Sequence, residues 1–232
     1  MWNSEPLSID RSAFLSRLLT GHGYVLPNPV ISGLALYFDE LFFWNRRINL
    51  TGALSEEELM AKHMGDTLFL HEALPYHAQT ALDIGTGAGI PGLILKLIRP
   101  SLVMFLADAR RKRISFLKNV IGKLGLQGVF AEQCIISKDV AIQAVFQTFP
   151  AQGVDVVLSQ AVCSIGGLAS MARPLMAKTG CIVSMKGPRY QEELAAAATY
   201  LKGVGLTYDV RSGKNPLNGH ERFLVILHQD GV

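Results

Sequence analysis

The sequence is poor in cysteine, with three residues in a chain of 232: Cys134, Cys163 and Cys181. They are odd in number, lie far apart and include no C-x-x-C pair, so we expect neither a disulfide framework nor a zinc site. No other metal site is predicted from the sequence. Thiols without partners are typical of a reducing compartment, and the cytoplasm is therefore the expected location.

Long apolar runs are also missing. Hydrophobic residues make up 49% of the chain, but they do not form a run of the roughly 18 residues that a membrane-spanning helix needs. The first six residues, Met-Trp-Asn-Ser-Glu-Pro, lack the basic region and the apolar stretch of a signal peptide. We therefore expect a cytoplasmic protein with no membrane partner.

Charge is scarce as well, because charged residues make up 18% of the chain and the net charge is only +3. Low charge combined with high hydrophobic content argues against disorder. A chain of 232 residues suits one sizeable domain, or one domain with an appendage. The net charge is too small to establish a nucleic-acid partner, so the distribution of the charges is more informative than their sum.

The most informative stretch runs from Leu82 to Gly92 and reads Leu-Asp-Ile-Gly-Thr-Gly-Ala-Gly-Ile-Pro-Gly. It begins as a short apolar strand that stops at Gly85. Gly85, Gly87 and Gly89 tolerate positive φ and let a ligand approach the backbone N–H groups. Pro91 suits the first turn of a helix, which we expect over residues 91–98. A strand, a glycine turn and a helix start together predict a nucleotide site.

Two kinds of nucleotide match this stretch. Residues 87–92 fit the dinucleotide fingerprint G-x-G-x-x-G, but Asp83 and the three turn glycines form the D-x-G-x-G-x-G pattern of S-adenosylmethionine (AdoMet) methyltransferases. An acid at a strand end can accept hydrogen bonds from a cationic amino acid, whereas it would repel a pyrophosphate. Asp108 follows 19 residues after Gly89, a spacing that suits ribose hydroxyls. The pattern favours AdoMet over NAD. Asp83 has an alternative structural role, in which it accepts N–H groups of the turn.

The pattern of elements predicts a helical cap at residues 1–78 and an α/β core at residues 79–232. The cap helices are expected near Phe14, from Asn28-Pro29 as N-cap and first helical residue to Trp44-Asn45, and from Ser55, which forms a capping box with Glu58. Strands and helices then alternate, which is typical of a mostly parallel sheet covered on both faces. We expect seven strands at 81–85, 102–107 (closed by Asp108), 129–134, 154–159, 181–185, 206–210 and 223–227, and helices at 91–98, 111–124, 164–177 and 191–201. The last two strands are expected to form a hairpin.

Four consecutive cations, Arg110 to Arg113, begin one of these predicted helices. Cations at a helix start oppose the macrodipole, which costs about 0.3 kcal/mol or more each. Phosphate binding beside the nucleotide site would explain the placement. A solvated charged face is the alternative. Further cations are expected on the same rim, namely Lys186, Arg189, Lys214 and Arg222.

Taken together, these residues resemble the bacterial 16S ribosomal RNA methyltransferase G family, also called glucose-inhibited division protein B. The resemblance covers nearly the whole chain. The cap element Trp-Asn-x-x-x-Asn-Leu-Thr and the Gly-Ile-Pro-Gly helix start are its more specific parts. The matching segments are Trp44 to Thr51, Lys62-His63 with Asp66, Asp83 to Gly92, Asp108 with Lys112-Arg113, Phe116 to Lys118, Ser159 with Ala161, Lys186-Gly187, and Glu221-Arg222.

The resemblance implies an AdoMet methyltransferase fold, with a Rossmann-like sheet of seven strands, mostly parallel with an antiparallel final strand. It also implies transfer of a methyl group from AdoMet to N7 of a guanine in 16S ribosomal RNA or the small ribosomal subunit, by a protein expected to be a monomer. The expected cofactor-binding residues are Asp83, Gly85, Gly87, Gly89, Ile90, Asp108, Ile136, Ser137 and Gln160. The expected RNA-binding residues are His63, Asn49, Arg110, Arg111, Arg113, Lys186 and Arg222.

The sequence departs from the family pattern at two places. Gln160 stands where the family usually has arginine, which keeps hydrogen bonding and loses the charge. Residues 135–137 replace an Arg-x-Glu-like element, so the adenine contact is expected from the backbone of Ile136 and Ser137. Asn45, Asn49 and Thr51 are expected to fix the loop between two cap helices, a loop that could border the guanine pocket.

Guanine N7 carries a free lone pair, so its methylation needs alignment and a dry pocket rather than a general base. We accordingly assign no catalytic residue for proton transfer. Three alternatives remain open: methylation of a small molecule or a protein, a non-catalytic regulator that binds AdoMet, and an NAD enzyme. As a lone histidine, His63 is also consistent with a packed core residue.

Overall fold

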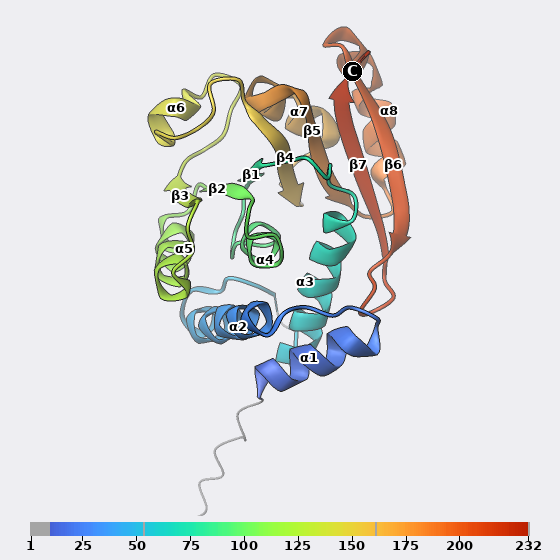
Figure 1. Ribbon diagram of the computed structural model, residues 1–232. Helices are drawn as coiled ribbons and strands as arrows, with labels where there is room; N and C mark the ends of the chain where they lie inside the picture. Colours follow the sequence, from blue (N-terminus) through green and yellow to red (C-terminus); the bar gives the residue numbers. More distant parts are fainter. Residues whose placement is uncertain (1–9, 53, 161, 232) are drawn as a thin grey trace, which may run out of the picture.

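The computed structural model describes residues 10–52, 54–160 and 162–231. A seven-stranded sheet forms its centre, with strand order β3-β2-β1-β4-β5-β7-β6 (Figure 1). The strands are β1 Thr80–Ile84, β2 Val103–Asp108, β3 Val129–Gln133, β4 Val154–Gln160, β5 Met176–Lys186, β6 Leu206–Lys214 and β7 Glu221–Gln229. Strands β1 to β5 pair in parallel, and β7 is antiparallel to both β5 and β6. The predicted mostly parallel sheet with an antiparallel final strand is confirmed.

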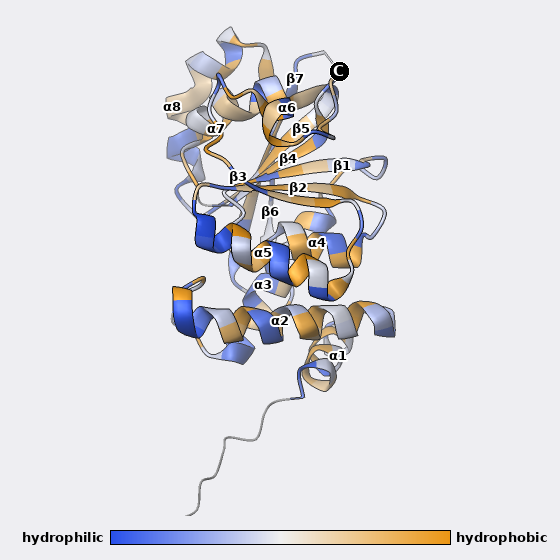
Figure 2. Ribbon diagram, turned by 90° about the vertical axis from the view of Figure 1, so that its left-hand side faces the viewer, coloured by the Kyte–Doolittle hydropathy of each residue, from blue (hydrophilic) through white to orange (hydrophobic). Residues whose placement is uncertain are grey.

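The helices lie on both faces of this sheet. Figure 2 shows α6, α7 and α8 on one face, α3, α4 and α5 on the other, and α1 and α2 beyond them as an outer layer. Their bounds are α1 Arg11–Gly21, α2 Asn28–Ile48, α3 Glu56–His71, α4 Gly92–Ile98, α5 Arg111–Leu124, α6 Ile142–Val145, α7 Ile165–Ala172 and α8 Tyr190–Gly203, with the short 3-10 helix η1 at Arg173–Leu175. None of these helices is both long enough and apolar enough to cross a membrane.

The central strands are apolar on both sides because each side has its own core. One core contains the buried residues of helices α1 to α5 and is called here the α1–α5 cluster; the other contains those of α6 to α8 and is called the α6–α8 cluster. On β1, Ala81 belongs to the α1–α5 cluster and Leu82 to the α6–α8 cluster. On β2, Met104 and Phe105 divide in the same way. Alternation of side chains along a strand therefore distributes the buried residues between two cores, as expected for a parallel sheet.

The cap helices share the first of these cores with α4 and α5. The buried residues Leu34 and Leu41 of α2 belong to the same cluster as Leu93 of α4 and Leu117 of α5. Tyr37 of α2 is fully buried, and its hydroxyl donates a hydrogen bond of 2.9 Å to the carbonyl oxygen of Ala88. The cap thus contacts the glycine-rich turn directly as well as through the core.

Two predicted helix boundaries are wrong. Helix α2 has Pro27 as its N-cap, so Asn28 is the first helical residue, and α2 continues to Ile48 rather than ending at Trp44-Asn45. Arg46 and Arg47 in its last turn suit the negative end of the helix dipole. Asn49, with a φ of 48°, ends the helix in the left-handed region.

The boundary between α7 and β5 also differs from the prediction of a helix to Ala177. Helix α7 ends at Ala172, and Pro174 lies in the following 3-10 turn, because proline has no N–H with which to continue the α-helix. Strand β5 begins at Met176 because Met176 already pairs with Val154 of β4. Tertiary pairing outweighs local propensity here. The short helix α6 was not predicted at all.

The predicted hairpin of β6 and β7 is confirmed, and its loop packs against α3. Asn215 is fully buried and donates hydrogen bonds to the Lys62 carbonyl (2.9 Å) and to Asp66 Oδ1 (2.7 Å). Its own side-chain oxygen accepts from the backbone N–H of Leu217. The hairpin loop therefore fixes α3, the helix that carries His63.

Gly65 of α3 leaves room for this contact, since a Cβ atom there would lie 1.9 Å from Asn215 Oδ1. Gly65→Ala should lower the free energy of unfolding by about 1–3 kcal/mol through overpacking. Gly122→Ala is the matched control, because nothing lies within 4 Å of a Cβ at that helical position, and it should raise stability by about 0.5–1 kcal/mol. Urea unfolding of both variants tests the opposite signs, and a stable Gly65→Ala variant would contradict the packing.

Candidate functional site

The glycine-rich turn connects β1 to α4 at the carboxyl edge of the sheet. Gly85, Gly87 and Gly89 have φ values of 69°, 60° and 82°, so the predicted positive φ angles are confirmed. The N–H groups of Gly85 and Thr86 both donate to the Ala107 carbonyl of β2, at 2.8 and 3.1 Å. The turn is therefore joined to the neighbouring strand.

Asp83 lies behind this turn and is 1% exposed. Its Oδ2 atom accepts hydrogen bonds from the Thr86 hydroxyl (2.7 Å) and from the Gly92 N–H (3.0 Å). Burial raises the pKa of this carboxyl to about 7, although these two hydrogen bonds act in the opposite direction. Both bonds hold the turn and the start of α4 together, which corresponds to the structural alternative for this residue.

Asp108 ends β2 and lies on the other side of the turn. Its Oδ1 atom accepts from the Arg110 N–H at 2.8 Å. Its Oδ2 atom accepts from the Gly87 N–H at 3.0 Å and from the Arg113 guanidinium at 2.9 Å. Asp108 is therefore a buried carboxylate that faces the glycine turn and has a cationic partner.

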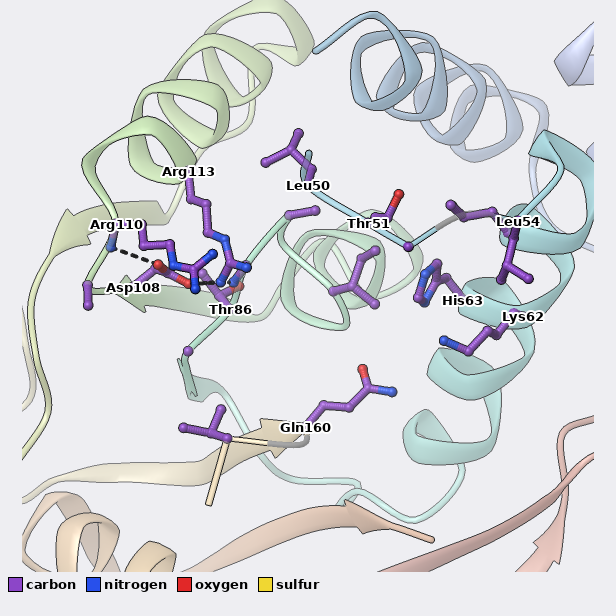
Figure 3. A pocket seen from close by; sticks show the side chains of 18 residues that line it. Leu50, Thr51, Leu54, Lys62, His63, Thr86, Asp108, Arg110, Arg113 and Gln160 are labelled. Carbon is purple, nitrogen blue, oxygen red and sulfur yellow. Dashed lines mark hydrogen bonds and ion pairs between the residues drawn. The ribbon is translucent and has the colours of Figure 1, made fainter. Parts of the chain in front are cut away.

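A cavity of about 640 Å³ lies between this edge of the sheet and the cap (Figure 3). That volume is within the usual range of small-molecule sites. Figure 3 shows Asp108, Arg110 and Arg113 at one end, and Lys62, His63 and Gln160 at the other. The described residues that line it are Leu50, Thr51, Gly52, Leu54, Leu59, Lys62, His63, Gly85, Thr86, Gly87, Ala88, Ile90, Asp108, Ala109, Arg110, Arg113, Gln160 and Val162.

The loop after α2 forms the cap side of the cavity. The Asn45 side chain accepts hydrogen bonds from the N–H groups of Leu50 (2.6 Å) and Thr51 (2.9 Å), which confirms that Asn45 fixes this loop. The loop borders the cavity through Leu50, Thr51, Gly52 and Leu54. Apart from Thr51, these lining residues were not predicted individually. The Trp-Asn-x-x-x-Asn-Leu-Thr element was the signal that could have located them.

His63 lines the cavity from α3, one residue after Lys62. Burial lowers the pKa of His63 to about 4, so the imidazole is neutral at pH 7. Its Nδ1 atom is buried and has no hydrogen-bond partner within the part of the chain that the structure describes, and the same holds for Thr51 Oγ1. Each unsatisfied buried polar atom costs about 1–3 kcal/mol. Such atoms at a cavity wall are therefore suited to bind a ligand.

Other predicted site residues lie outside this cavity. A Cβ atom on Gly89 would meet Leu93 and Leu117 at 2.8 and 2.9 Å, so Gly89 allows close packing of α4 and α5. Ile136 is buried in the α6–α8 core. The remaining members of this group are exposed and do not line the cavity, namely Asn49, Arg111 and Ser137.

Two predicted RNA contacts need correction. The Lys186 side chain is only 6% exposed, and its Nζ atom donates to Glu193 (2.8 Å) and to the Cys163 carbonyl (2.6 Å). Its amino group is therefore bound within the protein, and the expectation that Lys186 supplies a cation to the rim of the site is wrong. Arg222 pairs with Asp66 at 2.7 Å and is 17% exposed, so it supports α3 rather than facing the cavity. Both pairs join residues from different elements, which local sequence patterns do not reveal.

Comparison with known proteins agrees with this geometry. The profile of the family described as rRNA small subunit methyltransferase G matches residues 30–209. The Ribosomal RNA small subunit methyltransferase G of Syntrophotalea carbinolica is 37% identical over 214 residues, which cover 92% of this chain and 95% of the relative. The protein of the same name from Desulfotalea psychrophila is 36% identical over 228 residues, covering 95% and 100%. This chain belongs to the rRNA small subunit methyltransferase G family.

Membership of this family confirms the resemblance drawn from the cap element, the glycine turn and Asp108. The fold agrees as well. A solved SAM dependent methyltransferase from Aquifex aeolicus superposes with a TM-score of 0.51 at 18% identity, covering 70% of this chain and 88% of that one. At this identity the likeness concerns the fold alone, and it confirms the predicted methyltransferase fold.

The titration of Asp83 should be visible in stability. Burial raises the pKa of Asp83 from the ordinary carboxyl value of 3.8 to about 7, so the folded protein keeps this proton up to a pH of about 7. Between these values the unfolded chain binds fewer protons, so the free energy of unfolding falls as pH rises from about 4 to 7 and then levels off. Asp83→Asn cannot titrate at this position. The difference in the free energy of unfolding between Asp83→Asn and the wild type should therefore rise by on the order of 4 kcal/mol, in favour of the variant, from pH 4 to pH 7.

Urea unfolding between pH 4 and pH 8 measures this difference. The amide oxygen of Asp83→Asn can still accept from Thr86 and Gly92, so the comparison isolates the titration. Asp139→Asn is the matched control, because that residue is exposed in the loop after β3 and its replacement should leave the pH dependence unchanged. Parallel pH profiles of the wild type and Asp83→Asn would contradict the raised pKa.

Proposed function

We propose that this chain transfers the methyl group of AdoMet to N7 of a guanine in 16S ribosomal RNA of the small subunit. The proposal is supported by a single cavity that has a wall suited to a nucleotide and an opposite wall that carries groups able to bind a base. The glycine turn and the buried Asp108 form one wall, and the cap with Lys62 and His63 forms the other. The relatives of this chain are named Ribosomal RNA small subunit methyltransferase G, in agreement with this reading.

The residues present fit AdoMet. We place its ribose on Asp108 and its amino-acid end on the backbone of Gly85 and Gly87, since both glycines line the cavity. Ile90 contributes an apolar contact from the cavity wall. Asp83 acts through the turn that it holds. The adenine then lies beside Ala109, which lines the cavity, rather than beside Ile136 or Ser137.

AdoMet supplies an electrophilic methyl group on a positively charged sulfur. Guanine N7 has a lone pair and loses no proton, so the protein has to align the two atoms and exclude water. Leu50, Leu54 and Ile90 provide apolar walls for this purpose. His63 is neutral and suits hydrogen bonding to the base rather than charge stabilisation. No described residue is required as a general base.

The charge of the cavity suits RNA. Lys62, Arg110 and Arg113 line it, and Asp108 is the single acid among its described lining residues. Phosphate contacts of this kind give nucleic-acid binding a steep dependence on salt. We place the guanine at the end where Lys62, His63 and Gln160 point toward one another (Figure 3). Amide, imidazole and ammonium groups there can bond to the polar edge of a base.

The direct test is transfer of label. Incubation with tritiated AdoMet and small ribosomal subunits from a strain that lacks this methyltransferase should label one guanine of the 16S RNA, and base mapping should place the methyl group on N7. Methylation of a small molecule would instead depend little on salt, whereas RNA binding should weaken steeply as ionic strength rises. Absence of transfer to free 16S RNA and to subunits would refute the proposal.

Asp108→Asn tests the cofactor end separately. Loss of the charge should weaken AdoMet binding by about 1.5–3 kcal/mol, the usual range for hydrogen bonds to charged groups. Isothermal titration calorimetry with AdoMet measures this change. Asp209→Asn is the matched control, because that carboxyl is exposed on β6 and pairs with His228 away from the cavity. Equal AdoMet affinity in wild type and Asp108→Asn would contradict the ribose assignment.

A further inference from the structure

The guanidinium of Arg113 occupies the place on Asp108 that the proposed function gives to the ribose. Its Nη1 atom lies 2.9 Å from Asp108 Oδ2. A Cβ atom built on Gly87 would lie 3.7 Å from the same nitrogen. Arg113 therefore lies over the glycine turn and inside the cavity, as Figure 3 shows.

Asp108 has little hydrogen-bonding capacity left. Its Oδ2 atom accepts from Gly87 and Arg113, and its Oδ1 atom accepts from Arg110. A carboxylate accepts about four hydrogen bonds in total, so two ribose hydroxyls require one present partner to leave. Two of the three partners are backbone N–H groups, fixed by the turn and by the start of α5. The third is the Arg113 side chain, which is 26% exposed and belongs to neither backbone element.

We propose that Arg113 exchanges partners during the reaction. The pair between Arg113 and Asp108 gives way when the ribose of AdoMet takes Asp108, and Arg113 then turns to a phosphate group of the RNA. This inference rests on the proposed function and adds to it a coupling between cofactor binding and RNA binding. A planar guanidinium suits a phosphate because it can donate two parallel hydrogen bonds.

The surroundings of Arg113 favour its pairing with a phosphate group of the RNA. It lies in the first turn of α5, which has no acidic residue in that turn and no side-chain cap. Free N–H groups at a helix start attract anions. Arg110 lines the same end of the cavity, and neither it nor Arg111 takes part in an ion pair with a described acid. A phosphate group there meets several cations once Arg113 is released.

The exchange couples the two substrates. Arg113 becomes available for RNA only after the cofactor displaces it, so the cofactor should strengthen RNA binding. Coupling between binding sites is reciprocal, so RNA should strengthen cofactor binding by the same factor. Removal of the guanidinium should abolish the coupling and should also free Asp108 for the ribose.

The test uses Arg113→Met, with Lys118→Met as the matched control. Lys118 lies on the same helix and pairs with Glu132 outside the cavity. S-adenosylhomocysteine, which has the same ribose and no methyl group to transfer, is titrated by calorimetry without RNA. The affinity for a 16S RNA transcript is then measured with and without S-adenosylhomocysteine at fixed salt.

In the wild type and in Lys118→Met, S-adenosylhomocysteine should tighten RNA binding about tenfold, within the usual range for coupled sites. In Arg113→Met this factor should fall to about one, while binding of S-adenosylhomocysteine alone should become about three- to tenfold tighter, because a competing state is removed. Arg113→Lys, which keeps the charge without the planar fork, should retain part of the coupling.

Weaker binding of S-adenosylhomocysteine by Arg113→Met, or unchanged coupling in that variant, would overturn the exchange while leaving the proposed function intact. Wild-type protein that binds no S-adenosylhomocysteine would overturn the proposed function and the exchange together. The control separates a general effect of lost positive charge, because such an effect would reduce RNA binding of Lys118→Met and Arg113→Met alike without changing the coupling factor.

Discussion

The hydrogen bonds that Asp83 accepts from Thr86 and Gly92 are the constraint on which the site depends. Through them, one buried carboxyl holds both ends of the glycine turn. A Cβ atom on Gly92 would lie 2.8 Å from Asp83 Oδ2 and 2.5 Å from Leu106, so the start of α4 also packs tightly on the sheet. The turn can then present Gly87 to the cavity in one fixed conformation.

The same turn is held from the cap side by Tyr37, whose hydroxyl bonds to the Ala88 carbonyl. Tyr37 is fully buried, and burial raises its pKa well above the ordinary value, so the phenol stays protonated and remains a donor. The negative charge that Asp83 can carry acts in the same direction. A residue of the cap therefore stabilises the part of the core that faces the ligand, and the two walls of the cavity are mechanically linked.

Local patterns were sufficient for the framework of the site. The alternation of strands and helices, the positive φ of the turn glycines and the capping box at Ser55 each depend on a few neighbouring residues. The position of Asp108 at the end of β2 was also predictable, because the apolar residues of the strand stop directly before it. The family resemblance added the role of the loop after α2.

Contacts between distant elements could not be predicted in this way. Asp66 pairs with Arg222, which lies 156 residues further along the chain, and no local pattern relates the two. Lys186 was expected at the surface because its strand end is near a loop, but Glu193 of α8 and the Cys163 carbonyl cover it. Side-chain partners depend on how elements pack, and packing follows from the whole core rather than from any single segment.

This packing matters for a reaction that depends on alignment. Without a proton to transfer, the rate depends on how closely the walls keep the methyl group and N7 in line, since small displacements are costly. Asn45 holds the cap loop, Asn215 holds α3, and Asp83 with Tyr37 holds the turn. Within this frame, the proposed exchange of Arg113 between Asp108 and an RNA phosphate would link the binding of the two substrates. A cavity held by these contacts and lined by one exchangeable cation can therefore combine precise alignment with coupled binding of the two substrates.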